Sequence, residues 1–250
     1  MRFALISLGG AGSKMISEEA RKLFDEVEEI DIRKIEIRVE NNDVGVLYNE
    51  KPLSRFDCVY IRGSFRYALL QRAISFALKD ECYVPIAPSA YTIAHDKFLT
   101  MIELSKSKVS VPRTYFAATT KQAKRMLEEV NYPVILKIPS GTQGKGVMSA
   151  DSVSSAKSML DTLEVFNQPY LIQEFIDTDA TDIRAIVAGD EVIACMKRKG
   201  RAGEMRSNIH QGGIGMPFEM DYDTERLAIR AAKAVKADIC GVDLLEGINK

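Results

Sequence analysis

A glycine-rich loop with the sequence GTQGKG occupies residues 141–146, between the apolar runs VILKI and GVMSA. Three glycines in six residues lose much chain entropy on ordering, and a plain turn needs only one or two. Exposed backbone N–H groups with a lysine beside them suit the binding of an anion. Because both flanking runs are typical of strands, we predict a flap that joins two strands and closes over phosphate groups.

This loop matches neither of the two common phosphate-binding patterns. A Walker A loop needs lysine directly after its second glycine, whereas Val147 follows Gly146 and Lys145 comes one position too early. The Rossmann pattern needs a third glycine where the chain has Ser149. The N-terminal segment LGGAGSK also misses the Walker spacing, and we interpret it as a turn between a strand and a helix.

Strand-like and helix-like runs alternate from residue 1 to about residue 88. FALISL and FDCVYIRG are apolar runs typical of strands, and each is followed by a segment with helical spacing. The run IDIRKIEIRV alternates apolar and polar residues, which predicts one half-buried strand. The alternation favours an α/β lobe with an open, largely parallel sheet and helices on its faces.

The rest of the chain continues this alternation. Residues 93–108 and 224–237 have helical spacing, and the apolar runs YPVILKI, PYLIQEFI and DICGVDLL are typical of strands. Residues 182–200 predict two strands joined by a turn at Gly189-Asp190.

Composition and charge narrow the range of partners. The chain has 250 residues, 46% of them hydrophobic, enough for one large domain or two to three lobes. Its 34 basic and 35 acidic residues nearly cancel, so nothing calls for a nucleic-acid or membrane partner. The four cysteines are widely spaced without a C-x-x-C pair, and only two histidines are present. We therefore expect reduced thiols, no His-based metal site and a cytoplasmic location.

Seven short motifs occur in order between about residue 88 and the end of the chain. They are Asp96-Lys97, Val134-Ile135-Leu136-Lys137, GTQGKGV, Gln173-Glu174-Phe175-Ile176, Asp182-Ile183-Arg184, Arg206-Ser207-Asn208 and Gly241-Val242-Asp243. This ordered series closely resembles the ATP-grasp superfamily, and within it the RimK-type amino-acid ligases, which attach glutamate to a carboxyl group. The segment RSNIHQGG is especially typical of that branch.

The resemblance implies an ATP-grasp fold preceded by a Rossmann-like lobe. It divides the chain into a pre-ATP-grasp lobe at residues 1–88, a small ATP-grasp subdomain with the flap at 89–176, and a large subdomain at 177–250. The fold class is then α/β, with α+β character in the lobes that hold ATP.

The resemblance also implies an ATP-dependent ligase that releases ADP. In such enzymes ATP phosphorylates a carboxylate, and an amine attacks the acyl phosphate to form an amide or peptide bond. The expected substrates are ATP, an amino acid such as L-glutamate, and a carboxylate-bearing acceptor, which is a protein, a coenzyme or a carrier. Magnesium or manganese is the expected metal ion, and a homo-oligomer is left open.

The ATP site implied by the resemblance spans both ATP-grasp subdomains. It comprises Lys97, Lys137, Gly141, Thr142, Gln143, Gly144, Gly146, Gln173, Glu174, Phe175, Ile176, Asp182, Arg206, Ser207 and Asn208. Within this set Glu174 resembles the residue that reads the adenine edge, and Asp182 resembles the ribose-binding acid. Lys137 also stands out by itself, because a lysine that ends an apolar strand is costly unless its charge meets a partner. The alternative is a lysine whose ammonium reaches back to water.

Four further residues are assigned to catalysis, substrate and metal. Arg184 and Arg198 point by resemblance to the phosphate and substrate region, where a guanidinium suits carboxylate or phosphate because it donates two parallel hydrogen bonds. Arg62, at the end of a strand-like run in the first lobe, is a candidate for the substrate carboxylate. Asp243, an acid in the last apolar run, resembles the first magnesium ligand of the family.

The chain departs from the family after Asp243. ATP-grasp ligases continue into a strand with an E-x-N motif that supplies further metal ligands, and no such motif follows before Lys250. We therefore expect a C-terminal truncation that lacks one or more strands and binds ATP and metal poorly. The alternative function is a non-catalytic ATP-binding module that has lost this strand. An ATP-grasp kinase is disfavoured by the segment Arg206-Ser207-Asn208.

Overall fold

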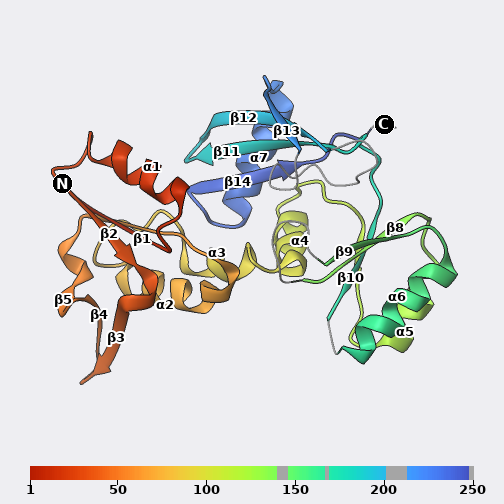
Figure 1. The fold of residues 1–250 in the computed structure, drawn as a ribbon, viewed down its shortest axis with the longest axis horizontal. Helices are drawn as coiled ribbons and strands as arrows, with labels where there is room; N and C mark the ends of the chain where they lie inside the picture. Colours follow the sequence, from red (N-terminus) through yellow and green to blue (C-terminus); the bar gives the residue numbers. More distant parts are fainter. Residues whose placement is uncertain (140–145, 167–168, 201–212, 248–250) are drawn as a thin grey trace. The chain divides into compact units, whose positions relative to one another are not determined.

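The computed structural model describes residues 1–139, 146–166, 169–200 and 213–247 (Figure 1). Its contacts divide the chain into two compact units. The first comprises Met1–His95 with Lys236–Ile239, and the second comprises Asp96–Val235 with Cys240–Lys250. The three-part division at residues 88 and 176 stays a prediction.

A parallel sheet forms the centre of the first unit, with the strand order β2-β1-β6. The elements are β1 (Arg2–Ser7), α1 (Ala11–Ala20), β2 (Glu26–Asp31), β6 (Cys58–Ile61) and α2 (Ala68–Leu78). Successive residues of a strand point to opposite faces of the sheet. Leu5 accordingly packs with Ala20 of α1, whereas Ile6 packs with Ile74 of α2. The predicted parallel sheet with helices on its faces is confirmed for this unit.

An antiparallel sheet in the same unit is not indicated by the sequence pattern. It is built, in the order β3-β4-β5, from β3 (Ile35–Glu40), β4 (Asp43–Tyr48) and β5 (Lys51–Pro52). The single strand predicted for IDIRKIEIRV is wrong, because a 3-10 turn, η1 (Ile32–Lys34), separates β2 from β3. Asp31 caps that turn by accepting the backbone N–H of Arg33 at 3.0 Å.

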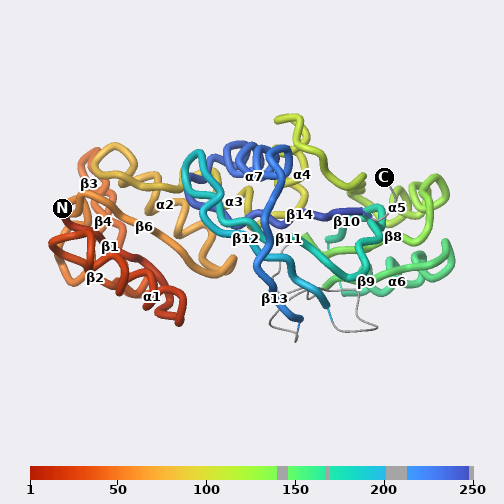
Figure 2. Tube along the Cα trace, turned by 90° about the horizontal axis from the view of Figure 1, so that it is seen from above, coloured from red at the N-terminus to blue at the C-terminus, as the bar shows by residue number. Residues whose placement is uncertain are grey.

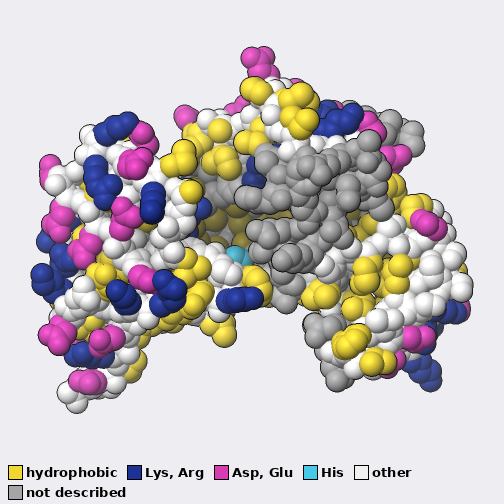
Figure 3. All heavy atoms as spheres, viewed as in Figure 1, with side chains coloured by type: hydrophobic (Ala, Val, Ile, Leu, Met, Phe, Trp, Pro, Cys, Tyr) yellow, Lys and Arg dark blue, Asp and Glu magenta, His cyan; other side chains and the backbone are white. Residues whose placement is uncertain are grey.

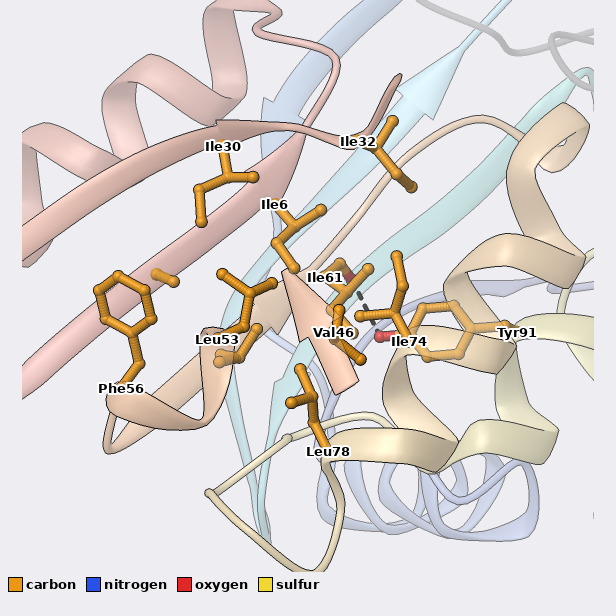
Figure 4. Packing of buried hydrophobic residues seen from close by; sticks show 12 residues of the cluster. Ile6, Ile30, Ile32, Val46, Leu53, Phe56, Ile61, Ile74, Leu78 and Tyr91 are labelled. Carbon is orange, nitrogen blue, oxygen red and sulfur yellow. Dashed lines mark hydrogen bonds between the residues drawn. The ribbon is translucent and has the colours of Figure 1, made fainter. Parts of the chain in front are cut away.

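The larger hydrophobic core of the first unit gathers residues from both sheets and from α2 (Figure 4). The core also includes side chains of the 3-10 turn η2 (Leu53–Arg55) and of helix α3 (Pro88–Ile93). A further 3-10 turn, η3 (Phe65–Tyr67), directly precedes α2 in the chain. The hydroxyl of Tyr91 donates to the Ile61 carbonyl at 3.1 Å, so its one polar atom is satisfied. Each fully buried leucine or isoleucine contributes about 1.5–3 kcal/mol, which holds η1 and η2 against the sheet.

The surface of the first unit mixes charges of both signs. On the face drawn in Figure 3, Lys and Arg side chains are interspersed with Asp and Glu side chains over this unit. Exposed pairs such as Arg21 with Glu29, 2.8 Å apart, account for part of the mixture. Within the part of the chain that the structure describes, no helix is both long and apolar enough to cross a bilayer.

The second unit begins with helix α4 (Lys97–Lys106). Asp96 is its N-cap, and the carboxylate accepts the backbone N–H groups of Phe98 and Leu99 at 2.9 Å each. An aspartate in this position stabilises the first turn of a helix. The prediction of one helix over residues 93–108 is therefore wrong at its start, because α3 ends at Ile93 and a capped helix begins afresh at Lys97.

A four-stranded antiparallel sheet follows, in the order β7-β10-β8-β9. Its elements are β7 (Thr114–Phe116), α5 (Thr120–Met126), β8 (Val134–Lys137), β9 (Val147–Ala150), α6 (Val153–Val165) and β10 (Leu171–Glu174). Helices α5 and α6 lie side by side (Figure 1), and their residues Ala123, Ala156 and Leu160 pack with Leu136 and Ile172 of the sheet. We call this sheet the small sheet.

The second sheet of the unit, which we call the large sheet, has the order β13-β12-β11-β14. Its elements are β11 (Thr181–Ala188), β12 (Glu191–Lys199), β13 (Ile214–Pro217), α7 (Tyr222–Ala234) and β14 (Ile239–Leu244). Helix α7 covers one face of it (Figure 2), where Ala228 and Ala232 pack with Ala185 and Val187. The predicted turn at Gly189-Asp190 joins β11 and β12, with Gly189 at φ +60°.

Candidate active site

The face of the small sheet opposite α5 and α6 carries a lysine and a glutamine. Leu136 and Ile172 point to the face packed on α5 and α6, so their neighbours Lys137 and Gln173 point to the other face. Helix α4 lies against this second face, since the ring of Phe98 stacks on that of Phe116 with centroids 4.7 Å apart. Lys137 and Gln173 are therefore held between strands and a helix.

The ammonium of Lys137 is partly buried and has a neutral hydrogen-bond acceptor. It donates to Oε1 of Gln173, and among the described residues it forms no ion pair. Burial, followed by the charge of Lys97, lowers the pKa of Lys137 to about 8. The charge of this lysine is thus desolvated, and no carboxylate of the described residues pairs with it, a situation that a bound anion relieves.

Lys97 ties the start of α4 to the strand end that leads into the glycine-rich loop. Its ammonium donates to the carbonyls of Ile138 and Pro139 at 3.1 and 3.2 Å, and its backbone N–H donates to Pro139 at 3.2 Å. Burial lowers the pKa of Lys97 as well. Two ammonium groups that repel each other at one sheet edge favour a ligand with several negative oxygens, such as a polyphosphate.

The two strands beside the loop form a hairpin, as the sequence predicts. Lys137 of β8 lies opposite Val147 of β9, and the N–H of Ile138 donates to the Gly146 carbonyl at 3.0 Å. Gly146 has φ +74°, and a Cβ there would lie 2.9 Å from Ile138, so glycine is needed at this position. The predicted flap residues Gly141, Thr142, Gln143 and Gly144 lie outside the described residues.

The predicted hinge residues follow one another at the end of β10. Gln173 is 6% exposed, whereas Glu174, Phe175 and Ile176 are partly exposed. The Glu174 carboxylate accepts the backbone N–H of Arg113 at 2.7 Å, and its own N–H donates to the Arg113 carbonyl at 2.9 Å. Contact of these residues with adenine stays a prediction.

Four predicted residues meet on the large sheet, on the face opposite α7. Ala185 and Val187 pack toward α7, so Asp182 and Arg184, which alternate with them along β11, point the other way. Arg198 lies opposite Asp182 across the strands. It donates from Nε and Nη2 to the two Asp182 oxygens, at 2.6 and 2.7 Å. Both side chains are nearly buried, at 12% and 11% exposure.

Asp243 of β14 joins this cluster. Its Oδ1 accepts from Arg198 at 2.7 Å and from Arg184 at 2.8 Å. A Cβ on Gly241 would lie 2.4 Å from a guanidinium nitrogen of Arg184, so glycine leaves the space in which that guanidinium lies. Burial acts against the charge of Arg198, but Asp182 and Asp243 outweigh it and raise its pKa. We call Asp182, Arg184, Arg198 and Asp243 the arginine–aspartate cluster.

Asp243 is the acidic residue in this cluster that best fits a metal ion. Its carboxylate is half exposed, and the described residues donate no hydrogen bond to its Oδ2. In the described ranges no group of three His, Cys, Asp or Glu side chains converges. Magnesium is commonly held by one or two carboxylates together with phosphate oxygens, so a single carboxylate fits an ion that arrives with a nucleotide.

The remaining predicted residues lie elsewhere. Arg206, Ser207 and Asn208 fall outside the described residues. Arg62 belongs to the first unit, where it follows β6 and its guanidinium lies 3.6 Å from the Cβ position of Gly12 at the start of α1. Its assignment to substrate stays a prediction.

Comparison with known proteins decides the family. A family model of the RimK-like ATP-grasp domain matches residues 94–249, which include both lysines and the whole arginine–aspartate cluster. The chain belongs to the RimK-like ATP-grasp family. The predicted ATP-grasp fold and the prediction of an ATP-dependent, ADP-forming ligase are thereby confirmed.

Relatives of this RimK-like chain carry ligase names. A probable alpha-L-glutamate ligase of Mannheimia succiniciproducens is 42% identical over 160 residues, which cover 64% of this chain and 54% of that protein. A probable alpha-L-glutamate ligase of Marinomonas sp. is 31% identical over 254 residues, covering 100% of this chain and 84% of that protein. The solved structure of the ATP-grasp ligase PsnB with minimal precursor, Mg and ADP superposes with a TM-score of 0.73 at 18% identity, covering 99% of this chain and 85% of PsnB.

Sequence reasoning missed two features of the RimK-like site. The first is Thr114, whose hydroxyl accepts an N–H of Gln173 at 2.8 Å. The second is the pairing of Asp182 with Arg198, which uses both carboxylate oxygens, so that ribose binding by Asp182 stays a prediction. The partner of a residue across two strands depends on the strand register, which the local sequence of either strand does not predict.

Proposed function

We propose that this chain uses ATP to join the amino group of L-glutamate, or of a similar amino acid, to a carboxyl group on an acceptor. The acceptor is a protein, a coenzyme with a glutamate tail or a carrier. Support for glutamate comes from relatives named probable alpha-L-glutamate ligases. The observation that carries the proposal is the partly buried ammonium of Lys137 near Lys97, whose hydrogen-bond partner among the described residues is the neutral amide of Gln173.

In this proposal the two lysines bind the phosphate groups of ATP. Lys97 and Lys137 approach the end of β8 from a helix and a strand, and no carboxylate of the described residues pairs with Lys137. Phosphate oxygens would supply the missing negative charge and stabilise the charged form of both lysines. The hairpin that begins at Lys137 then covers the phosphates.

The arginine–aspartate cluster acts in this proposal where the phosphoryl group is transferred to the carboxylate. Transfer of a phosphoryl group to a carboxylate leaves negative charge on phosphoryl and carboxyl oxygens, and preorganised cations stabilise it. Arg198 is fixed by Asp182 on one side and Asp243 on the other, so its guanidinium is oriented before substrate arrives. Arg184 is more exposed, which suits contact with a substrate.

Asp243 is the residue that would hold magnesium. A magnesium ion held there would supply positive charge to offset the negative charge that builds up on phosphate oxygens. The two arginines orient Asp243 through Oδ1 and leave Oδ2 for another partner. PsnB, the superposed ligase, was solved with Mg and ADP.

The reaction can be tested by product analysis. The chain is mixed with Mg-ATP, glutamate and single acceptors, such as peptides with a C-terminal glutamate and coenzymes with a glutamate tail. We expect ADP release that requires both glutamate and one acceptor class, and a product heavier by one glutamyl residue or more. ATP hydrolysis that is indifferent to both substrates would contradict the proposal.

A further inference from the structure

The side chain of Gln173 connects the two elements that carry the lysines. It is 6% exposed and lies on the same sheet face as Lys137, on the neighbouring strand. Its Oε1 accepts the Lys137 ammonium, while its Nε2 faces Thr114 at 2.8 Å and the sulfur of Met101 on α4 at 3.8 Å. The amide is therefore fully engaged inside the chain.

The orientation of the Gln173 amide is determined by a chain of hydrogen bonds. The hydroxyl of Thr114 donates its one proton to the Pro112 carbonyl at 2.8 Å. Thr114 can then act toward Gln173 only as an acceptor, so the amide nitrogen must face Thr114. The amide oxygen is left facing Lys137, where an acceptor is required because an ammonium group only donates.

A neutral acceptor at this place has a specific consequence. A carboxylate would bind the ammonium more strongly but would cancel its charge, whereas an amide oxygen orients the ammonium and leaves the charge for another anion. Among the described residues, the charged group that shifts the pKa of Lys137 is Lys97, which is also positive. Gln173 thus orients the ammonium of Lys137 without neutralising its positive charge.

We propose that Gln173, oriented by Thr114, is a positioning residue that aims the ammonium of Lys137 at the nucleotide phosphates and keeps its charge uncompensated. This inference rests on the proposed function for the identity of the anion. It gives the side chain of Gln173, which the resemblance assigns to the ATP site, a specific role toward Lys137, and it adds Thr114 as the residue that orients this side chain.

Two substitutions of Gln173 with opposite electrostatic effects test the proposal. Gln173→Glu places a carboxylate beside Lys137 and should raise the pKa of the lysine by about one unit or more, whereas Gln173→Leu leaves the ammonium without an acceptor and should lower it. The measurement is a pH titration of the ε-carbon NMR signal of Lys137 in the nucleotide-free chain, with the signal assigned from Lys137→Arg. Both variants should bind Mg-ATP about tenfold more weakly at pH 7 in a calorimetric titration.

The matched control is Gln122→Glu, which makes the same change on the exposed surface of α5 and should alter neither the Lys137 titration nor ATP affinity. Thr114→Val and Thr114→Ser form a second test. Valine removes the hydroxyl that orients the amide, so it should shift the Lys137 titration and weaken ATP binding, while serine should restore both. This pair decides the question if the Gln173 variants do not fold.

The outcomes separate this inference from the proposed function. A Lys137 titration that is the same in the unchanged chain, Gln173→Glu and Gln173→Leu would overturn the positioning role, as would Thr114→Val indistinguishable from Thr114→Ser. A chain that binds no Mg-ATP at all would overturn the proposed function, and the nucleotide-free titration would still decide whether Gln173 positions Lys137.

Discussion

The small sheet and the large sheet of the second unit present charge in opposite ways. On the small sheet, Lys137 is desolvated, meets a neutral amide and has another lysine as its charged neighbour. On the large sheet, Arg198 is also largely enclosed but meets two carboxylates. The difference indicates that the small sheet is suited to bind an anionic ligand through Lys137, whereas the charges on the large sheet neutralise one another within the fold.

This contrast predicts different consequences for stability and for binding. Breaking a buried ion pair leaves a charge without a partner and destabilises the fold, whereas removing an unsatisfied charge relieves a desolvation penalty. A substitution that breaks the Asp182–Arg198 pair should therefore affect folding first, and a substitution of Lys137 should affect ligand binding first.

The largest effect is expected for Arg198→Ala. The buried carboxylate of Asp182 loses its cation, so the free energy of unfolding should fall by about 3–5 kcal/mol, as for other broken buried pairs. Urea denaturation measures this quantity. The control is Arg21→Ala, which breaks an exposed pair with Glu29 and should cost less than about 1 kcal/mol. Equal losses in the two variants would remove the distinction between the sheets.

Lys137→Met is expected to weaken ATP binding without destabilising the fold. ATP affinity should fall roughly 100-fold, because a desolvated cation facing the phosphates is lost, while the free energy of unfolding should not decrease. Calorimetric titration with Mg-ATP and urea denaturation check the two halves. Lys124→Met, at a partly exposed lysine of α5 that pairs with Asp161, should leave ATP affinity unchanged and cost less than about 1 kcal/mol of unfolding free energy. Unaltered ATP affinity in Lys137→Met would reject the phosphate role of this residue.

Gly241→Ala tests whether the position of Arg184 on the large sheet matters for catalysis. The added methyl group would lie 2.4 Å from a guanidinium nitrogen of Arg184, which must then move away from Asp243. We expect turnover to fall by roughly tenfold or somewhat more, because a small misplacement of a reacting group slows catalysis, with folding largely retained. Gly45→Ala in β4, where the nearest atom is at 3.4 Å, is the matched control and should leave turnover unchanged. Turnover of Gly241→Ala equal to that control would refute the positioning of Arg184.

The smallest effect concerns pH. The pKa of Lys137 lies near 8 in the nucleotide-free chain, so the chain loses the proton above that pH, whereas a complex with phosphates keeps it. ATP affinity should thus be constant below pH 7 to 7.5 and weaken by about fourfold between pH 7 and 8.5. Binding constants across this range check the slope, and an affinity that rises with pH would contradict the sign.

Several parts of the site could be predicted from the sequence, for physical reasons. Lys137 and Asp243 are charged residues at or near the end of apolar strands, a placement that is costly without a partner and therefore conspicuous. The strand-loop-strand setting of GTQGKG follows from two apolar flanks, and β8 and β9 confirm it.

Other parts depend on contacts that no local pattern encodes. Asp182 meets Arg198 only through the register of β11 and β12, which shifts at a bulge between Ile186 and Val187. Likewise the strand predicted across residues 30–39 breaks because Asp31 caps a turn and Ile32 turns into the core. Thr114 looks like an ordinary strand residue until the pairing with Gln173 is known.

The central claim, that Lys137 carries an uncompensated charge awaiting phosphate, is tested most directly by proton uptake. Calorimetric titration with Mg-ATP at pH 9, repeated in buffers of different ionisation enthalpy, counts the protons taken up on binding. Since Lys137 with a pKa of about 8 is mostly neutral at that pH and is protonated in the complex, it should contribute an uptake of about 0.9 proton per nucleotide, which Lys137→Met abolishes. Absence of uptake, or the same uptake in Lys137→Met, would contradict the claim.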